Sequence, residues 1–153
     1  MWNKVILTCL LFSGSAWAEL PNLERTPGAI NAEITQETIK DTICNPHWST
    51  KSIRPSVGYT NKLKKKQIIE YGYADKAMKD YEEDHLISLE LGGSPTAPEN
   101  LWPEPYAGKY GARVKDQIEN KLHKLVCSGK LTLQEAQHMI STDWIKAYET
   151  YLP

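Results

Sequence analysis

The chain has 153 residues, of which 41% are hydrophobic and 24% charged, and its formal net charge is −1 at pH 7. These proportions are ordinary for globular proteins, and they exclude an intrinsically disordered chain, a collagen and a long coiled coil. The near balance of charges also excludes a uniformly cationic nucleic-acid binder of the histone type, although it leaves room for a local basic patch. We therefore expect one folded domain.

The first 18 residues are typical of a secretory signal peptide. Lys4 gives a charged start, residues 5–12 form an apolar run, and residues 15–18 (SAWA) end the segment with the small residues that precede a cleavage site. A membrane anchor is the competing interpretation, but the apolar run is far shorter than the roughly 20 residues that a bilayer requires. The sequence predicts a secreted or periplasmic protein without a membrane anchor, whose single domain covers residues 19–153.

Cleavage after residue 18 would remove Cys9 and leave Cys44 and Cys127. Thiols of exported proteins usually pair, and the sequence has no Cys-x-x-Cys pattern or Cys/His cluster that would indicate zinc. We predict a Cys44–Cys127 disulfide, to which the chain-entropy model assigns about 4–5 kcal/mol of stabilisation. This bond would tie the N-terminal third of the chain to the C-terminal helices.

The N-terminal part of the mature chain gives weak structural signals until a basic segment begins. Residues 19–31 predict a loosely held lead-in, and residues 35–43 fit a short helix or a strand. Residues 51–66 contain six basic side chains and no acidic one. Thr60 or Asn61 can cap a helix over residues 62–71. Four lysines lie together at its start: Lys62, Lys64, Lys65 and Lys66.

An acidic region follows, and its centre predicts a hairpin. Residues 85–91 alternate imperfectly between apolar and polar and end at Gly92-Gly93, a pattern that fits a strand leading into a turn. Residues 100–102 can return as a second short strand. We therefore expect two strands joined by a loop of turn-forming residues.

The C-terminal third predicts helices. Residues 112–126 carry apolar side chains with the spacing of an amphipathic helix, and Ser128-Gly129 can stop it. Residues 132–135 (TLQE) form a capping box, so a second helix begins there, and residues 143–148 fit a final turn or two. With the hairpin, these helices predict an α+β fold.

Residues 81–93 (YEEDHLISLELGG), followed closely by Glu99-Asn100-Leu101, resemble the HNH nuclease family. The shared pattern is an Asp-His pair at the start of the first strand, apolar strand residues, a Gly-Gly turn and then Asn-Leu, and it covers roughly 20 residues densely. The resemblance implies a ββα-metal fold, in which a hairpin and one helix surround a divalent cation. The wider run from Tyr59 to Trp144 also looks like small exported bacterial proteins described as HNH-like.

The resemblance implies a role for each motif residue. Asp84 would ligate the metal, His85 would activate water, and Asn100 would hold the imidazole or the loop in place. The chemistry agrees, because phosphodiester hydrolysis needs a nucleophilic water and a cation, and imidazole titrates near neutral pH. On a regular strand Asp84 and His85 point to opposite faces, so both can serve one site only where the strand twists or ends.

The sequence departs from the family pattern in the helix that follows. HNH proteins carry a last His or Asn there as a metal ligand, but residues 102–111 contain neither. Further along, Asp116, Glu119 and His123 share one helical face, so a carboxylate could replace the missing ligand. Oxygen ligands favour magnesium or calcium over zinc, and we expect magnesium. If no carboxylate reaches Asp84, the site would bind metal weakly or be inactive.

Simpler interpretations exist for several of these residues. Asp116 and Glu119 alone would most often be a solvated helix face. Beside an acidic metal site, however, the run from Lys62 to Lys66 is placed as a contact to a phosphate backbone would be. His47, His123 and His138 have no motif around them, and only His123 merits a test.

The sequence therefore predicts a metal-dependent, sequence-nonspecific nuclease that acts on DNA or RNA outside the cytoplasm. The alternative is a catalytically silent module that keeps the fold and binds a protein or a cell-envelope partner. A polysaccharide hydrolase is a weaker third hypothesis, because the sequence fixes no carboxylate pair at glycosidase separation. Nothing in the sequence identifies an immunity protein as a partner.

Overall fold

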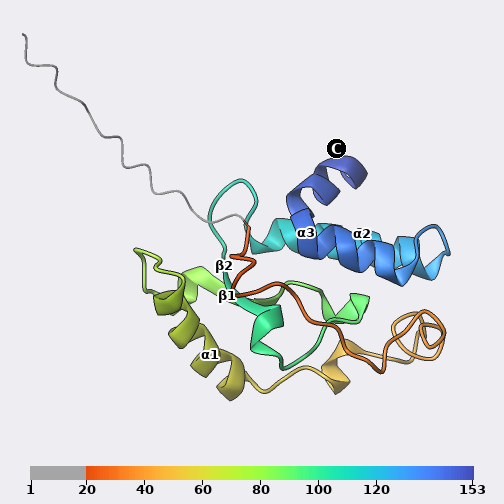
Figure 1. Ribbon diagram of the computed structural model, residues 1–153, viewed down its shortest axis with the longest axis horizontal. Coiled ribbons are helices and arrows are strands. Elements are labelled where there is room, and N and C mark those ends of the chain that lie inside the picture. Colours follow the sequence, from red (N-terminus) through yellow and green to blue (C-terminus); the bar gives the residue numbers. More distant parts are fainter. Residues whose placement is uncertain (1–19) are drawn as a thin grey trace, which may run out of the picture.

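The computed structural model describes residues 20–153 and has the predicted α+β class. Its centre is an antiparallel hairpin of β1 (Tyr81–His85) and β2 (Leu101–Pro105). The helix α1 (Val57–Glu70) lies on one side of this hairpin, and α2 (Ala112–Cys127) with α3 (Leu133–Tyr151) lies on the other (Figure 1). The predicted signal peptide, residues 1–18, lies outside the described residues.

The hairpin tolerates two prolines because of its register. The N–H of Leu86 donates to the carbonyl of Asn100, which places the inter-strand hydrogen bonds at even-numbered residues of β2. Pro103 and Pro105 occupy the alternate positions, where an N–H would point away from β1. The missing donors therefore cost the hairpin no hydrogen bond.

The expected strand over residues 85–91 is wrong, because β1 lies earlier and ends at His85. Residues 86–88 form a loop, and Leu89–Leu91 form a single 3-10 turn, η3. The side chain of Asn100 bonds both the N–H and the C=O of Ile87, so these groups are not available to the sheet. Gly92, with φ of 74°, then reverses the chain in the left-handed region that glycine adopts most easily.

The helix α1 begins five residues before the predicted start. Ser56 caps it by accepting a hydrogen bond from the N–H of Tyr59 at 3.3 Å, so neither Thr60 nor Asn61 is the cap. Ile68 is 1% exposed and packs on the hairpin side, together with the buried Gln67. The later part of α1 therefore anchors the helix to the hairpin, and the lysines lie just before this part.

The pair α2 and α3 forms most of the apolar core. The amphipathic pattern of residues 112–126 is confirmed, and so is the capping box, in which Thr132 and Glu135 bond each other's backbone N–H. The α3 helix is kinked at Asp143, whose φ of −160° is not helical. The buried side chains shared by the two helices are Ile118, Leu122, Val126, Ala136, Ile140 and Trp144.

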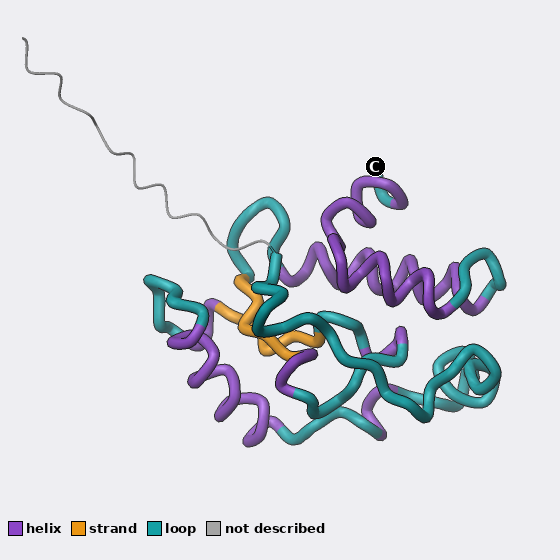
Figure 2. Tube along the Cα trace, in the orientation of Figure 1, coloured by secondary structure: helices purple, strands orange, loops and turns teal. Residues whose placement is uncertain are grey.

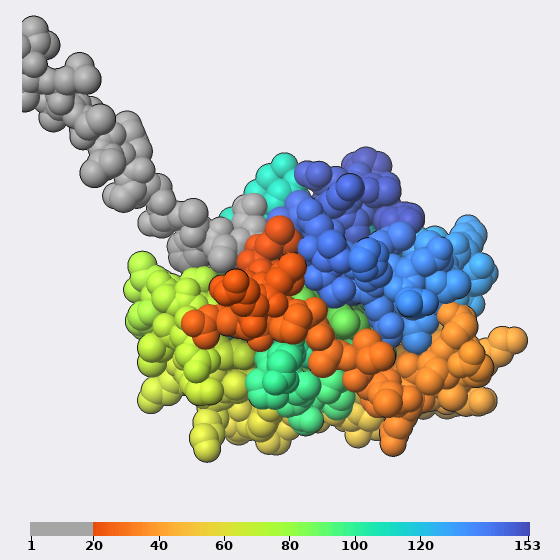
Figure 3. Space-filling model, in the orientation of Figure 1, coloured from red at the N-terminus to blue at the C-terminus, as the bar shows by residue number. Residues whose placement is uncertain are grey.

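The predicted Cys44–Cys127 disulfide is present, with a Cα–Cα distance of 5.3 Å. It fastens the irregular N-terminal segment, residues 20–56, to the end of α2. This segment has no long regular element and runs as a loop over the body of the protein (Figure 2). In the space-filling view its first part lies across one face, between α1 and the α2–α3 pair (Figure 3). Among residues 20–153, no helix combines the length and the apolar character that crossing a bilayer requires.

Candidate functional site

The side chain of Lys115 joins α2 to the end of β1. Its Nζ donates to Asp84 Oδ2 at 2.6 Å and to the carbonyl of His85 at 2.9 Å, and it also bonds Glu119 Oε1. Glu119 lies one helical turn after Lys115 and therefore faces the same way. Lys115 is only 1% exposed. An ammonium group thus lies beside Asp84, where the sequence predicts a metal ion.

Glu104 is the third carboxylate of this cluster. It is 1% exposed, and neither of its oxygens accepts a hydrogen bond from any donor in residues 20–153. Burial, reinforced by the negative charge of Asp84, raises the pKa of Glu104 well above its usual range. Glu104 and Asp84 lie in hydrogen-bond contact, so in the ion-free protein the proton that Glu104 holds is shared with Asp84. We refer to Asp84, Glu104, Lys115 and Glu119 as the Lys115 cluster.

The ionisable groups of the Lys115 cluster shift one another's pKa values. Burial alone would raise the pKa of Asp84, but the adjacent Lys115 lowers it overall. Burial raises the pKa of Glu119 to about 8 in spite of its ion pair with Lys115. Burial opposes the charge of Lys115, yet the surrounding carboxylates raise its pKa above the usual value. The ammonium is therefore firmly charged, whereas the carboxylates compete for it.

His85 is held in a single tautomer. Its Nε2 lies 2.9 Å from the carbonyl oxygen of Pro95, and a carbonyl can only accept, so Nε2 carries the hydrogen. Its Nδ1 makes no hydrogen bond within residues 20–153. Burial lowers the pKa of His85, which keeps the ring neutral near pH 7. The lone pair of Nδ1 is therefore free to accept a proton.

Asp84 and His85 can serve one site, because the strand ends at this pair. β1 ends at His85, whose ring bonds the loop after η3 while Asp84 faces α2. The exposed Arg54 lies close enough for its charge to lower the pKa of both His85 and Asp116. A cation from the N-terminal segment thus borders the site.

Asn100 holds the loop rather than the imidazole. It is fully buried, and its Oδ1 accepts from the N–H of Ile87 at 2.9 Å and of Ala29 at 3.3 Å. Its Nδ2 donates to the carbonyls of Ile87 and Ser94, each at 3.0 Å. Gly93 completes this arrangement, because a Cβ there would lie 1.7 Å from the oxygen of Ile87. Asn100 therefore positions His85 indirectly, through the loop that carries Pro95.

The structure separates the three helix residues that the sequence grouped on one face. Glu119 belongs to the Lys115 cluster, whereas Asp116 is exposed at its margin. Partial burial, with the charge of Asp84, raises the pKa of Asp116. His123 donates from Nε2 to the carbonyl of Ile43 at 2.7 Å, away from Asp84. Of the expected metal ligands, only Asp84 and Glu119 are brought together.

His123 lies instead at the disulfide. One ring nitrogen and the sulfurs of Cys44 and Cys127 lie within 4.8 Å of one another, as the ligands of a metal ion would. In the disulfide the two sulfurs are bonded to each other, so reduction would have to precede any metal binding there. The sequence did not predict this group, because Cys44 is far in the chain from His123 and Cys127.

The predicted basic run does not form one patch. Lys64 donates to the carbonyl of Tyr81 at 2.9 Å, and Lys66 pairs with Glu70 at 3.2 Å. Lys62 and Lys65 are exposed on the outer side of α1. The Lys115 cluster lies between the hairpin and α2, so α1 presents these lysines from the opposite side of the hairpin (Figure 1).

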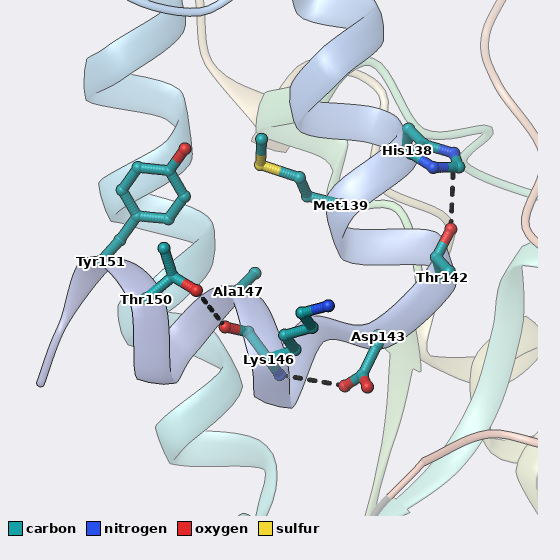
Figure 4. Close-up of a pocket in the computed structure, with 8 residues that line it drawn as sticks. All are labelled: His138, Met139, Thr142, Asp143, Lys146, Ala147, Thr150 and Tyr151. Carbon is teal, nitrogen blue, oxygen red and sulfur yellow. Dashed lines mark hydrogen bonds between the residues drawn. The ribbon is translucent and has the colours of Figure 1, made fainter.

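A separate hollow of about 270 Å³ lies at the kink of α3 (Figure 4). In this view Asp143 accepts from the N–H of Lys146, and His138 bonds Thr142. None of the residues that the sequence predicted for the site lines it. We assign the chemistry to the hairpin and not to this hollow.

Sequence reasoning missed Glu104, Lys115 and Arg54. A signal for Lys115 was available, since it falls in the buried stripe of α2 where the amphipathic pattern calls for an apolar residue. No family model matches the chain, and no match is found among curated proteins or solved structures. The likeness to HNH nucleases therefore rests on the motif residues alone.

Proposed function

We propose that the protein is a divalent-metal-dependent phosphodiesterase that cleaves DNA or RNA without sequence preference. The observation that carries this proposal is the state of His85, whose Nε2–H is bonded to Pro95 and whose Nδ1 is left as a free base. A histidine in this state, next to a carboxylate that faces a cation position, is equipped for general base catalysis.

His85 would take the proton from the attacking water at Nδ1. The Pro95 carbonyl prevents the ring from turning, so the proton is accepted at a fixed place. Asn100 supports the same geometry, because it holds the loop on both sides of η3. These residues orient the base and do not need to touch the phosphate.

The cluster carboxylates fit a divalent cation, and the contact between Asp84 and Glu104, which needs a proton or a cation between the two groups, supports that fit. Asp84 and Glu119 would hold the ion, as oxygen ligands that magnesium accepts. When bound, such an ion neutralises the scissile phosphate and stabilises the leaving oxygen. Arg54, at the edge of the site, would bind an adjacent phosphate of the polyanion.

The cysteines and the first 18 residues support a place of action outside the cytoplasm. The Cys44–Cys127 disulfide is compatible with an oxidising compartment. Together with the signal-like sequence of residues 1–18, it supports action in the periplasm or outside the cell.

The test is plasmid nicking and RNA cleavage with magnesium, manganese or chelator, for the wild type, His85→Ala and the control His138→Ala. Loss of a positioned general base costs on the order of a hundred- to ten-thousand-fold in rate. His138 lies on α3 in the separate hollow, so its removal should leave the rate unchanged. Circular dichroism establishes that each variant is folded, and activity that survives His85→Ala would refute the assignment.

A silent interaction module is the second candidate, and the position of Lys115 favours it. The ammonium already compensates Asp84 and Glu119 without any metal ion. Under this hypothesis the purified protein neither binds divalent ions at the cluster nor cleaves nucleic acid with any of them.

A further inference from the structure

The Lys115 cluster contains more carboxyl groups than its own cation can pair. Three carboxylates, from Asp84, Glu104 and Glu119, surround one ammonium group. Asp84 and Glu104 also lie in hydrogen-bond contact with each other, and two carboxyl groups in contact need a proton or a cation between them. A divalent cation fits this position, because it accepts carboxylate oxygens as ligands.

Glu104 shows that the set is built for a ligand that Lys115 does not replace. Lys115 reaches Asp84, Glu119 and the carbonyl of His85, but not Glu104. Both oxygens of Glu104 are buried and receive no hydrogen bond from an N–H or hydroxyl group of residues 20–153, while the carboxyl group lies in contact with Asp84. An ion between the three carboxylates would give these oxygens a partner.

We propose that Asp84, Glu104 and Glu119 are the ligands of a divalent cation and that Lys115 is its built-in competitor. In the ion-free protein, the Lys115 ammonium keeps Asp84 and Glu119 together across the gap between β1 and α2. To bind, an ion has to displace the ammonium from contacts with Asp84, Glu119 and the carbonyl of His85. Lys115 therefore sets the ion concentration at which the site fills. This inference rests on the proposed function, because it describes how that same site is regulated.

The physical basis is direct competition between two cations for the same oxygens. Because the ammonium is attached to α2, it is present beside these oxygens at any concentration of free ions. Its four-carbon stem is flexible enough to move the charge aside when a stronger cation arrives. The result is a site that is stable without metal and that binds metal weakly.

The direct test is calorimetric titration of Mn²⁺ into chelator-treated wild type, Lys115→Met and the control Lys121→Met, without nucleic acid. Methionine keeps most of the volume of lysine and removes the charge. Lys115→Met should bind Mn²⁺ about tenfold more tightly or better, because the competitor is gone. Lys121, on the same helix, should behave as the wild type. Equal or weaker binding by Lys115→Met overturns the proposal.

Lys115→Met exposes three carboxylates to one another and could unfold the ion-free chain. In that case circular dichroism should show that Mn²⁺ restores the fold, and a chain that stays unfolded at saturating Mn²⁺ contradicts the proposal. Glu104→Gln keeps Lys115 and gives an independent answer. It should weaken Mn²⁺ binding about tenfold or more if Glu104 is a ligand, and unchanged affinity removes Glu104 from the site.

The titration separates this inference from the proposed function, because it measures binding and not hydrolysis. If the variants shift the affinity as expected and the wild type cleaves nothing, the nuclease is wrong and the ion site remains. If the wild type cleaves nucleic acid and Lys115→Met leaves the affinity unchanged, the nuclease remains and the competition is wrong.

Discussion

Asn100 and the Lys115 cluster are both buried polar centres at the hairpin, and they differ in how completely their groups are paired. The side chain of Asn100 makes four hydrogen bonds to backbone groups and leaves no atom unused. In the Lys115 cluster, one ammonium serves two carboxylates, and Glu104 contacts Asp84 but receives no hydrogen bond from an N–H or hydroxyl group of residues 20–153. Complete pairing stabilises a fold, whereas incomplete pairing costs stability and usually persists where something is bound.

The largest effect on stability should come from removing the side chain of Asn100, whose polar atoms are all paired. Asn100→Ala leaves the backbone groups of Ile87, Ser94 and Ala29 without their partner, and each buried unpaired group costs about 1–3 kcal/mol. We expect the free energy of unfolding to fall by about 3–5 kcal/mol, since such losses are not fully additive. Urea unfolding followed by circular dichroism measures it.

Asn120→Ala is the matched control, because Asn120 is exposed on α2 and its side chain bonds only one carbonyl of its own helix. It should change the stability by less than about 0.5 kcal/mol. If Asn100→Ala were as mild as the control, the loop would not depend on Asn100, and its indirect support of His85 would be lost with it.

Removing the carboxylate of Glu104 from the Lys115 cluster should change the stability in the opposite direction. Burial keeps Glu104 protonated in the folded protein, whereas the unfolded carboxyl is ionised at pH 7. Glu104→Gln removes the cost of taking up this proton, so in chelator at pH 7 it should raise the free energy of unfolding by about 1–2 kcal/mol. Addition of Mn²⁺ should raise the melting temperature of the wild type and leave that of Glu104→Gln nearly unchanged. Glu33→Gln, at an exposed position, is the control for loss of charge. A destabilised Glu104→Gln would mean that Glu104 is already paired and that the two centres do not differ.

Glu83 is a buried carboxylate without a donor that lies outside the Lys115 cluster, so it shows what such a group costs where no ligand is proposed. It lies on the opposite face of β1, its oxygens have no donor in residues 20–153, and burial raises its pKa to about 8 from the usual 4.5. The folded state therefore holds a proton that the unfolded state releases first, so stability falls as the pH rises from about 4.5 to about 8. No buried ammonium accompanies Glu83 as Lys115 accompanies Glu119, although Lys64 lowers its pKa in part.

Glu83→Gln should abolish this part of the pH dependence. The variant and the wild type should be about equally stable at pH 4, and the variant should be more stable by about 1–3 kcal/mol at pH 8. Thermal unfolding across that range measures the difference, with the exposed Glu99→Gln as control. Parallel pH profiles for Glu83→Gln and the wild type would show that Glu83 does not titrate abnormally.

The sequence was sufficient wherever a local pattern decides the structure. The helix from residue 112, the capping box at Thr132 and the Cys44–Cys127 disulfide are confirmed. The strand over residues 85–91 is wrong because Asn100, a residue distant in sequence, takes the backbone groups that a sheet would need. No periodicity reports such a contact.

The candidate site divides in the same way. The Asp84–His85 pair falls at the end of β1, not at the start of a strand as the motif implied, and Glu119 is brought to Asp84. Lys115 and Glu104 were missed, because charged residues are usually solvated and their burial depends on packing between β2 and α2. Their burial is a tertiary property that only the folded chain displays.

The smallest effect concerns the surface lysines of α1, where used and unused groups again lie side by side. Lys64 is fixed by the carbonyl of Tyr81, whereas Lys62 and Lys65 are exposed on the outer side of the helix. Each lysine that neutralises one phosphate of a duplex contributes about −0.9 to the slope of log K against log salt concentration. If α1 contacts the backbone of bound DNA, Lys62→Gln/Lys65→Gln should flatten this slope by about 2, with unchanged stability. Fluorescence polarisation of a labelled duplex, in chelator to suppress cleavage, measures the slope over a range of NaCl concentrations.

Lys64→Gln is the contrasting variant, because it loses a bond to β1 and should lower the stability while affecting the slope little. An unchanged slope in the double variant would assign Lys62 and Lys65 to a solvated face and leave phosphate binding to Arg54, whose charge acts on both His85 and Asp116.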